Sequence, residues 1–163
     1  MFVLDANIFV EAYKRYYSFD IAPVFWNALK RKAEENLLIS IDRIYAEIDK
    51  YGDDDELKRW AKNEFRAYFV STDSEEVFAA YSEIMDWVVN QPQYYESAKS
   101  EFASVADSWL LAYAKAYNYT VVTHEEYKPE AKRKIFIPNV CRAFNIPYIN
   151  TFEMLRRLNI RFR

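Results

Sequence analysis

The sequence is poor in the residue types that build many cofactor sites, with one cysteine, one histidine and one glycine among 163 residues. The lone Cys141 excludes an internal disulfide framework and Cys-rich zinc or iron–sulfur sites. The lone His124 excludes multi-histidine metal sites such as the His-Glu-x-x-His zinc helix, and a single glycine, Gly52, excludes both the Gly-rich dinucleotide fingerprint and the P-loop. Several large enzyme classes are therefore excluded by counting.

An excess of positive charge is also missing, because the formal net charge is −3. This balance argues against a general DNA-coating protein, whose basic footprint usually dominates the domain. It does not exclude a nuclease, since a metal-binding acidic cluster lowers the net charge while local basic patches persist. No basic leader with a cleavage site is visible and no apolar run approaches about 18 residues. We therefore expect no signal peptide, no membrane span and a cytoplasmic location.

What is present suits a globular protein: hydrophobic residues make up 52 % of the chain and charged residues 29 %. This composition excludes disorder, and the length is typical of one domain. The chain contains neither internal repeats nor Ser- or Pro-rich linkers. We therefore predict a single domain spanning residues 1–163.

Strands and helices alternate in the predicted element order. Periodicity predicts strands at residues 2–4, 37–41, 119–123, 134–137 and 148–150, and helices at 22–35, 53–69, 73–90, 104–118 and 151–158. A further helix carries Ile44, Ile48 and Tyr51 and is expected to end at Gly52, while Thr72-x-x-Glu75 is a capping-box spacing. No two strands are joined by a hairpin-length turn. The pattern therefore predicts an α/β fold with a parallel sheet covered by helices on both faces.

Four acidic residues follow or face the predicted carboxyl ends of strands, where parallel α/β sheets bind ligands. Asp5 ends the first strand, Glu47 lies on the helix after the second, Asp107 opens the apolar helix 104–118, and Glu125 follows the strand 119–123. Two bare carboxylates 4 Å apart repel by about 4 kcal/mol at an effective dielectric of about 20, so such a cluster must be partly protonated or hold a cation. Oxygen ligands without histidines or thiols point to Mg²⁺ or Mn²⁺, and thus to attack on a phosphodiester by a metal-activated water.

The segments that carry these residues are VLDANIF, YAEI, ADSWLLAYAKAY and YTVVTHE. In order and spacing they resemble the PIN-domain nucleases over essentially the whole chain, and most of all a bacterial and archaeal PIN subfamily similar to VapC-type toxins. The resemblance implies a three-layer α/β/α fold with a short parallel sheet and a Mg²⁺- or Mn²⁺-dependent endoribonuclease with one or two ions. It also implies a toxin that forms homodimers and is inhibited by an antitoxin protein.

The resemblance carries over residue by residue. Asp5, Glu47 and Asp107 match the three family acidic residues, and Asn7 matches a frequent polar residue that helps to hold the metal-bound water. Glu125 stands where the family usually has aspartate. This departure either shifts a second metal ion or leaves room for one ion only, and Glu126 is an alternative counterpart.

Each carboxylate also has an ordinary structural interpretation. Ser104-x-x-Asp107 has the spacing of a capping box, in which the two side chains accept backbone amide hydrogens. Asp5 could be a turn or N-cap residue. Glu47 could belong to a solvated helix face, although its apolar neighbours favour the inner side.

The basic residues have two interpretations of equal weight, a solvated face or contacts with RNA phosphates. The candidates are Lys132, Arg133, Lys134, Arg156 and Arg157, with Arg161 and Arg163 near them in the tail. For His124, a strand-end role is favoured over that of a general base, and Cys141 is most simply a core residue. Aromatic residues could stack on bases, but Trp26, Trp87 and Trp109 fall at core-like helical positions.

Two other functions compete with the nuclease. A decayed PIN-fold binding or scaffold module would keep the fold without the catalysis, and the glutamate at position 125 is its only sequence support. An aspartyl-phosphate phosphatase also places an aspartate after its first strand. That chemistry requires a second aspartate two positions later, where this chain has Asn7.

Overall fold

The computed structural model describes residues 1–52 and 54–162 and contains one five-stranded sheet in the order β3-β2-β1-β4-β5. The strands are β1 (Phe2–Leu4), β2 (Leu38–Ile41), β3 (Phe69–Val70), β4 (Thr120–Val122) and β5 (Tyr148–Ile149). Every neighbouring pair is parallel, as the alternating pattern predicts. The carboxyl ends of all five strands therefore meet at one edge of the sheet.

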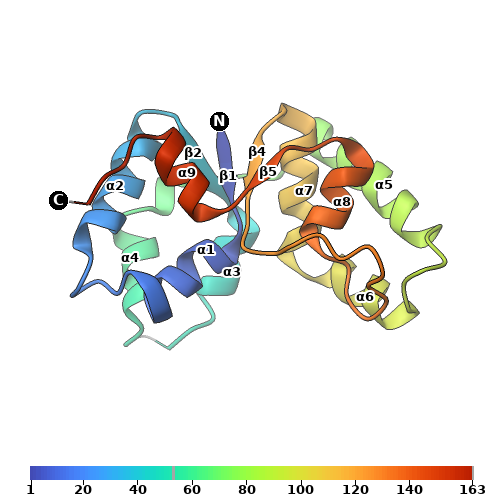
Figure 1. Ribbon diagram of the computed structural model, residues 1–163, viewed down its shortest axis with the longest axis horizontal. Coiled ribbons are helices and arrows are strands. Elements are labelled where there is room, and N and C mark those ends of the chain that lie inside the picture. The colour runs from blue at the N-terminus through green and yellow to red at the C-terminus, as the bar shows by residue number, and fades with distance from the viewer. Residues whose placement is uncertain (53, 163) are drawn as a thin grey trace.

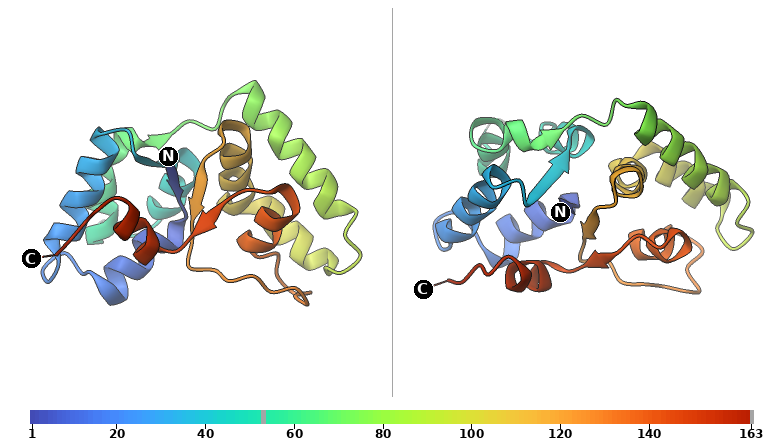
Figure 2. Two further views of the ribbon diagram at one scale, coloured as in Figure 1. Left: turned by 45° about the horizontal axis from the view of Figure 1, so that its top comes forward. Right: turned by 90° about the horizontal axis from the view of Figure 1, so that it is seen from above.

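Helices cover both faces of the sheet. They are α1 (Ala6–Glu11), the π-helix η1 (Ala12–Tyr16), α2 (Pro23–Glu34), α3 (Asp42–Ile48), α4 (Glu56–Asn63), the 3-10 helix η2 (Arg66–Tyr68), α5 (Glu75–Val89), α6 (Glu96–Ser104), α7 (Ala106–Tyr117), α8 (Ile137–Phe144) and α9 (Thr151–Arg157). In Figure 1, α2, α4 and α9 lie on the left of β1 and β4, and α5 to α8 lie on the right. The view from above in Figure 2 shows the same division into helix, sheet and helix layers. The expected three-layer α/β fold is confirmed.

The middle strands are apolar on both faces because a helical layer covers each face. Val3, Leu4, Leu38 and Val121 are all fully buried. The helix α7 packs against α5 and α8 as well as against β4. Contacts on several sides explain why its sequence is apolar almost all round. This helix matters for the site, because it runs back along the sheet and returns its amino end to the carboxyl ends of the strands.

The predicted end of the helix that carries Ile44 and Ile48 is wrong. The helix α3 ends at Ile48 with Asp49 as its C-cap, four residues before Gly52. The left-handed positions of the described chain are held by asparagines instead, among them Asn118 (φ 59°) after α7 and Asn145 (φ 56°) after α8. Asparagine tolerates this conformation because its short polar side chain can bond locally, so a search for glycine misses these helix ends.

The predicted helix over residues 53–69 is shorter than expected, and its first residue, Asp53, lies outside the described part of the chain. Asp55 caps α4, where its carboxylate accepts the backbone N–H of Lys58 at 2.8 Å. The segment then passes through η2 into β3, in which Phe69 pairs with Ser40 of β2. A strand of two residues is too short to produce an alternating pattern, so only the pairing reveals it.

The expected capping box Thr72-x-x-Glu75 is also wrong. Ser74 caps α5, and its hydroxyl accepts the backbone N–H of Val77 at 3.2 Å. The buried Thr72 instead binds the carboxylate of Asp42, through its backbone N–H at 3.1 Å and its hydroxyl at 2.9 Å. This pair of bonds fastens the start of α3 to the connection between β3 and α5.

The strand predicted at residues 134–137 does not form. Residues 134–136 have no regular structure, and Ile137 begins α8 with Pro138 in its first turn. Proline suits that place because its missing N–H would have no helical partner there. Within residues 1–52 and 54–162, no helix combines the length and apolarity needed to cross a membrane.

Candidate active site

Asp5 lies directly after β1 and is a buried carboxylate, with 2 % of its surface exposed. Its Oδ2 accepts a hydrogen bond from the Thr123 hydroxyl at 3.0 Å, and its backbone N–H donates to the carbonyl of Val122 at 3.0 Å. Burial raises the pKa of Asp5 well above its ordinary value, and the nearby charges of Asp107 and Glu125 raise it further. The fold thus places an acid where ionisation is costly unless a positive charge is close.

Asp107 faces the same region from the first turn of α7. Burial, followed by the charge of Glu125, raises its pKa to about 7, although Lys134 acts in the opposite direction. Near neutral pH the protonated and ionised forms of the Asp107 carboxyl are therefore both populated. Such a shift is typical of functional sites, where like charges are held together out of water.

Glu125 follows β4 and points inward, with 9 % of its side chain exposed. Its Oε1 accepts the backbone N–H of Ile137 at 2.9 Å, and its Oε2 lies 3.4 Å from the ammonium of Lys134. Its alternative, Glu126, is 81 % exposed and pairs at 3.7 Å with Lys128. The placement therefore favours Glu125 over Glu126 as the fourth member of the acidic group.

Glu47 approaches Asp107 from α3. Its Oε1 accepts the backbone N–H of Ala106, the first residue of α7, at 3.0 Å. The free N–H groups at the start of a helix favour a nearby negative charge, so this hydrogen bond stabilises both the carboxylate of Glu47 and the first turn of α7. Glu47 also contributes to the raised pKa of Asp107, which places its charge close to that carboxyl.

The acidic group fits a hard divalent cation in donor type and charge, since it offers carboxylate oxygens without histidine or thiol. Its present arrangement is not a formed ligand shell. Among residues 1–52 and 54–162, no three Asp, Glu, His or Cys side chains stand so that they could hold one metal ion. Glu47 and Glu125 each use an oxygen on a backbone N–H, so both would have to turn to reach a shared ion.

The capping interpretation of Asp107 does not hold in the form predicted. Ser104 is the last residue of α6, and its hydroxyl donates to the carbonyl of Glu101 at 2.8 Å. The N-cap of α7 is Val105, which makes no side-chain capping bond. The Ser104-x-x-Asp107 spacing therefore forms no capping box.

Two further candidate residues, Asn7 and His124, have clear positions. Asn7 is exposed in the first turn of α1, two residues after Asp5. The Nε2 atom of His124 lies 3.0 Å from the hydroxyl of Thr151, and burial lowers the pKa of this imidazole. His124 thus holds the start of α9, in keeping with a strand-end role.

The basic candidates lie in two places. Lys132, Arg133 and Lys134 are exposed in the connection between β4 and α8, and the ammonium of Lys134 reaches Glu125. Arg156 and Arg157 are exposed on α9 and share Glu153, at 3.8 and 3.1 Å. No contact of either group tests RNA binding, which stays a prediction. Arg163 lies outside the described residues.

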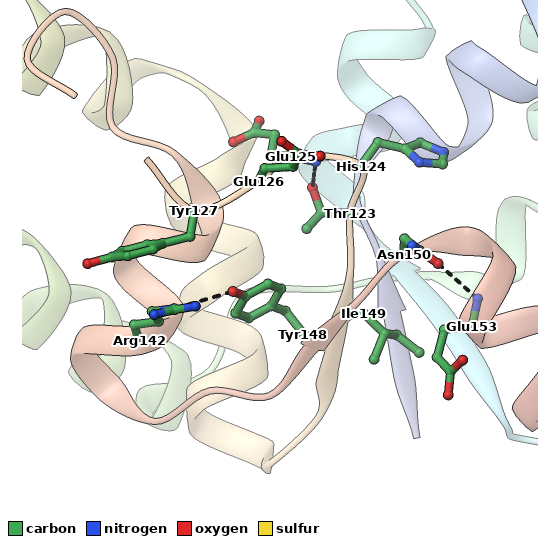
Figure 3. A pocket seen from close by; sticks show the side chains of 10 residues that line it. All are labelled: Thr123, His124, Glu125, Glu126, Tyr127, Arg142, Tyr148, Ile149, Asn150 and Glu153. Carbon is green, nitrogen blue, oxygen red and sulfur yellow. Dashed lines mark hydrogen bonds between the residues drawn. The ribbon is translucent and has the colours of Figure 1, made fainter. Parts of the chain in front are cut away.

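A pocket of about 600 Å³ opens beyond β4 and β5 (Figure 3), and of the four candidate acids only Glu125 lines it. The guanidinium of Arg142 lies 3.9 Å from the ring centroid of Tyr127, and its Nε donates to the Tyr148 hydroxyl at 3.4 Å. The other acidic residues of the pocket, Glu126 and Glu153, are each paired with a basic side chain. The charges of this pocket are therefore largely compensated within the chain.

A second pocket, of about 250 Å³, lies between α3 and the junction of α6 and α7. Its lining includes Glu47, Arg43, Lys50 and Trp109. Neither Arg43 nor Lys50 is among the residues predicted from the sequence to form the site. The spacing of Arg43, four residues before Glu47, is the signal that would have found it, because it places both on one face of α3. Lys50 lies in the turn after this helix, where helical spacing gives no signal.

The comparisons with known proteins agree with this fold. A chain in the crystal structure of VapBC2 from Rickettsia felis, bound to a DNA fragment from their promoter, superposes with a TM-score of 0.55 at 17 % identity, over 91 % of this chain and 97 % of that chain. At that identity the likeness shows the fold alone, and it confirms the expected PIN-like α/β architecture. No curated protein matches the chain. A family model described as "Domain of unknown function (DUF4411)" matches residues 2–162, and the chain therefore belongs to the DUF4411 family.

Proposed function

We propose that this protein is a Mg²⁺- or Mn²⁺-dependent endoribonuclease whose active site is the acidic group at the carboxyl edge of the sheet. One observation carries the proposal: Asp107 and Glu125, from two distant segments, lie close enough to the buried Asp5 for their charges to raise its pKa. A fold that only needed stability would avoid this repulsion. The edge is also where parallel α/β proteins bind their ligands.

Asp5, Asp107, Glu47 and Glu125 would hold the cation, and Asn7, exposed beside Asp5, would orient the attacking water. When bound, the ion would lower the pKa of that water and polarise the phosphodiester. Asp107, with a pKa of about 7, would release its proton as the cation binds, so binding should strengthen with rising pH. Glu47 and Glu125 would exchange their backbone N–H partners for the ion.

The biological role that we infer is that of a toxin held in check by an antitoxin protein. Two findings support it: the resemblance of the sequence to VapC-like PIN nucleases, and the fold shared with a chain of the VapBC2 structure. An RNA substrate, a homodimer and a cytoplasmic location follow from the same inference.

A scaffold without catalysis is the second candidate, and a specific observation favours it. Lys134 already neutralises part of the charge of Glu125, and Ile137 already occupies its other oxygen. In this alternative the acidic group would have lost its ion and acquired an internal cation instead. The two candidates differ in whether a divalent ion binds.

The deciding experiment is a titration of Mn²⁺ into the wild-type chain and into Asp107→Asn. The heat of binding and the midpoint temperature of thermal unfolding are measured for both proteins. We expect wild-type binding with stabilisation of about 2.7 kcal/mol at a hundredfold excess over Kd, and loss of both in Asp107→Asn. Glu126→Gln, a matched change at an exposed neighbour, should behave like the wild type. A folded wild-type chain that binds no Mn²⁺ would favour the scaffold.

Cleavage then tests the reaction itself. With labelled RNA and Mn²⁺, Asp5→Asn should abolish cleavage while the circular dichroism spectrum stays that of the wild type. Undiminished cleavage by this variant would contradict the assignment of Asp5.

A further inference from the structure

Arg43, on α3, has a guanidinium group that is held in place by uncharged partners. Its carbon Cζ lies 3.8 Å from the centroid of the Trp109 ring, and its Nε donates to the Thr72 hydroxyl at 3.1 Å. Stacking on an aromatic face and one fixed hydrogen bond orient the plane of the group. Among residues 1–52 and 54–162, no side chain or backbone group bonds to its two terminal nitrogens, so these can donate to a ligand.

The aromatic partner explains why this orientation is stable. Tyr81 stacks on Trp109 with ring centroids 4.0 Å apart and an interplanar angle of 16°. The indole ring thus packs against the phenol ring as well as the guanidinium, and Trp109 serves as a platform for Arg43. No carboxylate forms an ion pair with Arg43 in the described parts of the chain, which makes it unlike Arg156 and Arg157.

The position of Arg43 connects it with the candidate active site. It lines the pocket of about 250 Å³ together with Glu47 and Lys50, and Glu47 follows it by one helical turn on α3. Lys50 is exposed and lines the same pocket. Two cationic side chains therefore share this pocket with the carboxylate of Glu47.

From this geometry we propose that Arg43 binds a phosphate of the RNA strand next to the scissile bond, with Lys50 as a second, weaker contact. The inference rests on the proposed function, and it assigns the side from which the strand reaches the acidic group. A planar guanidinium can donate two parallel hydrogen bonds to a phosphate, and one that is already oriented loses less entropy on binding.

The opposite side of the acidic group suits an RNA backbone less well. There the larger pocket (Figure 3) presents Glu125, Glu126 and Glu153, and its basic neighbours are engaged with these acids or with tyrosines. A phosphate entering on that side would meet three carboxylates around the guanidinium of Arg142. On the α3 side it would meet Arg43 and Lys50 beside a single carboxylate, that of Glu47.

The test measures RNA binding without metal, so that it does not depend on the cation site. Fluorescence anisotropy of labelled oligouridylate in EDTA would compare the wild type, Arg43→Ala, Arg43→Lys and the control Arg31→Ala at about 50 to 200 mM KCl. Arg31 is exposed on α2, across the sheet from α7, and its loss changes the net charge equally. Thr72 keeps its bonds to Asp42 in the Arg43 variants, so these should fold, which thermal unfolding would verify.

We expect Arg43→Ala to weaken binding about tenfold and to lower the slope of log K against log salt by about 0.7, the value for one phosphate on a single strand. Arg43→Lys should keep that slope and lose about threefold in affinity, because its ammonium replaces the stacked planar group. Arg31→Ala should match the wild type.

Equal affinity and slope in Arg43→Ala and the wild type would overturn the inference, as would an equal loss in Arg31→Ala. A wild-type chain that binds no oligouridylate in EDTA would overturn it as well. In each of these cases the Mn²⁺ titration still decides separately whether the acidic group is a metal site.

Discussion

Asp107 makes the metal-free protein sensitive to pH, and the effect can be worked out from its raised pKa. Its pKa is about 7 in the folded chain, compared with an ordinary value of 3.8. The folded state therefore binds the proton more tightly than the unfolded state, and the stability from this group is complete below about pH 4. It is lost as the pH rises to about 7, and a difference of about three pKa units corresponds to about 4 kcal/mol.

The perturbation that isolates this effect is Asp107→Asn, which holds position 107 in a permanently neutral form. Urea unfolding in EDTA, followed by tryptophan fluorescence at several values from about pH 4 to pH 8, gives the free energy of unfolding of each protein. We expect the two proteins to have similar stability at the acidic end. The variant should become more stable than the wild type by about 4 kcal/mol at the alkaline end.

The control is Glu126→Gln, which removes an exposed carboxylate of the same region and should leave the pH profile unchanged. Asp5 is also buried with a raised pKa beside Asp107, so Asp107→Asn should flatten the wild-type profile without abolishing its slope. Parallel profiles for the wild type and Asp107→Asn would refute the reasoning, because they would mean that burial and the neighbouring charges do not hold this carboxyl neutral.

Two further predictions concern the neighbourhood of α7. Glu47→Gln keeps an oxygen that can accept the N–H of Ala106, so the midpoint temperature of its thermal unfolding in EDTA should stay close to that of the wild type. Calorimetry should show weaker Mn²⁺ binding, and an unchanged Mn²⁺ affinity would remove Glu47 from the ligand set. Leu111→Ala empties a fully buried position in α7 and should lower the free energy of unfolding by about 2 to 5 kcal/mol in urea titrations, and a smaller loss would mean that the core closes around the cavity.

Most of the fold was accessible from local patterns. The strands β1, β2, β4 and β5 and the helices α2, α7 and α9 were predicted within a few residues, since apolar periodicity reports which face of a segment is buried. Two of the failures fall where long-range contacts decide. The strand β3 exists because Phe69 pairs with β2, and Thr72 bonds to Asp42 instead of capping a helix.

The candidate site shows the same division. Strand ends in a parallel sheet share one edge, so the positions of Asp5, Glu47, Asp107 and Glu125 could be predicted to converge. In the structure the charges of Asp107 and Glu125 act on Asp5, and those of Glu125 and Glu47 act on Asp107. The direction of each carboxylate could not be predicted. Glu47 turns to Ala106 and Glu125 to Ile137 because folding brings these N–H groups within reach.

By itself, the sequence determined the layer order, the parallel sheet and the edge at which four acids gather, because periodicity and strand ends are properties of short segments. The tertiary structure alone decided that Arg43 rests on Trp109, that Lys134 reaches Glu125, and that Glu126 faces water. These contacts join segments that are distant in the chain or depend on which side of a loop is buried. Their geometry therefore arises only when the helices have packed on the sheet.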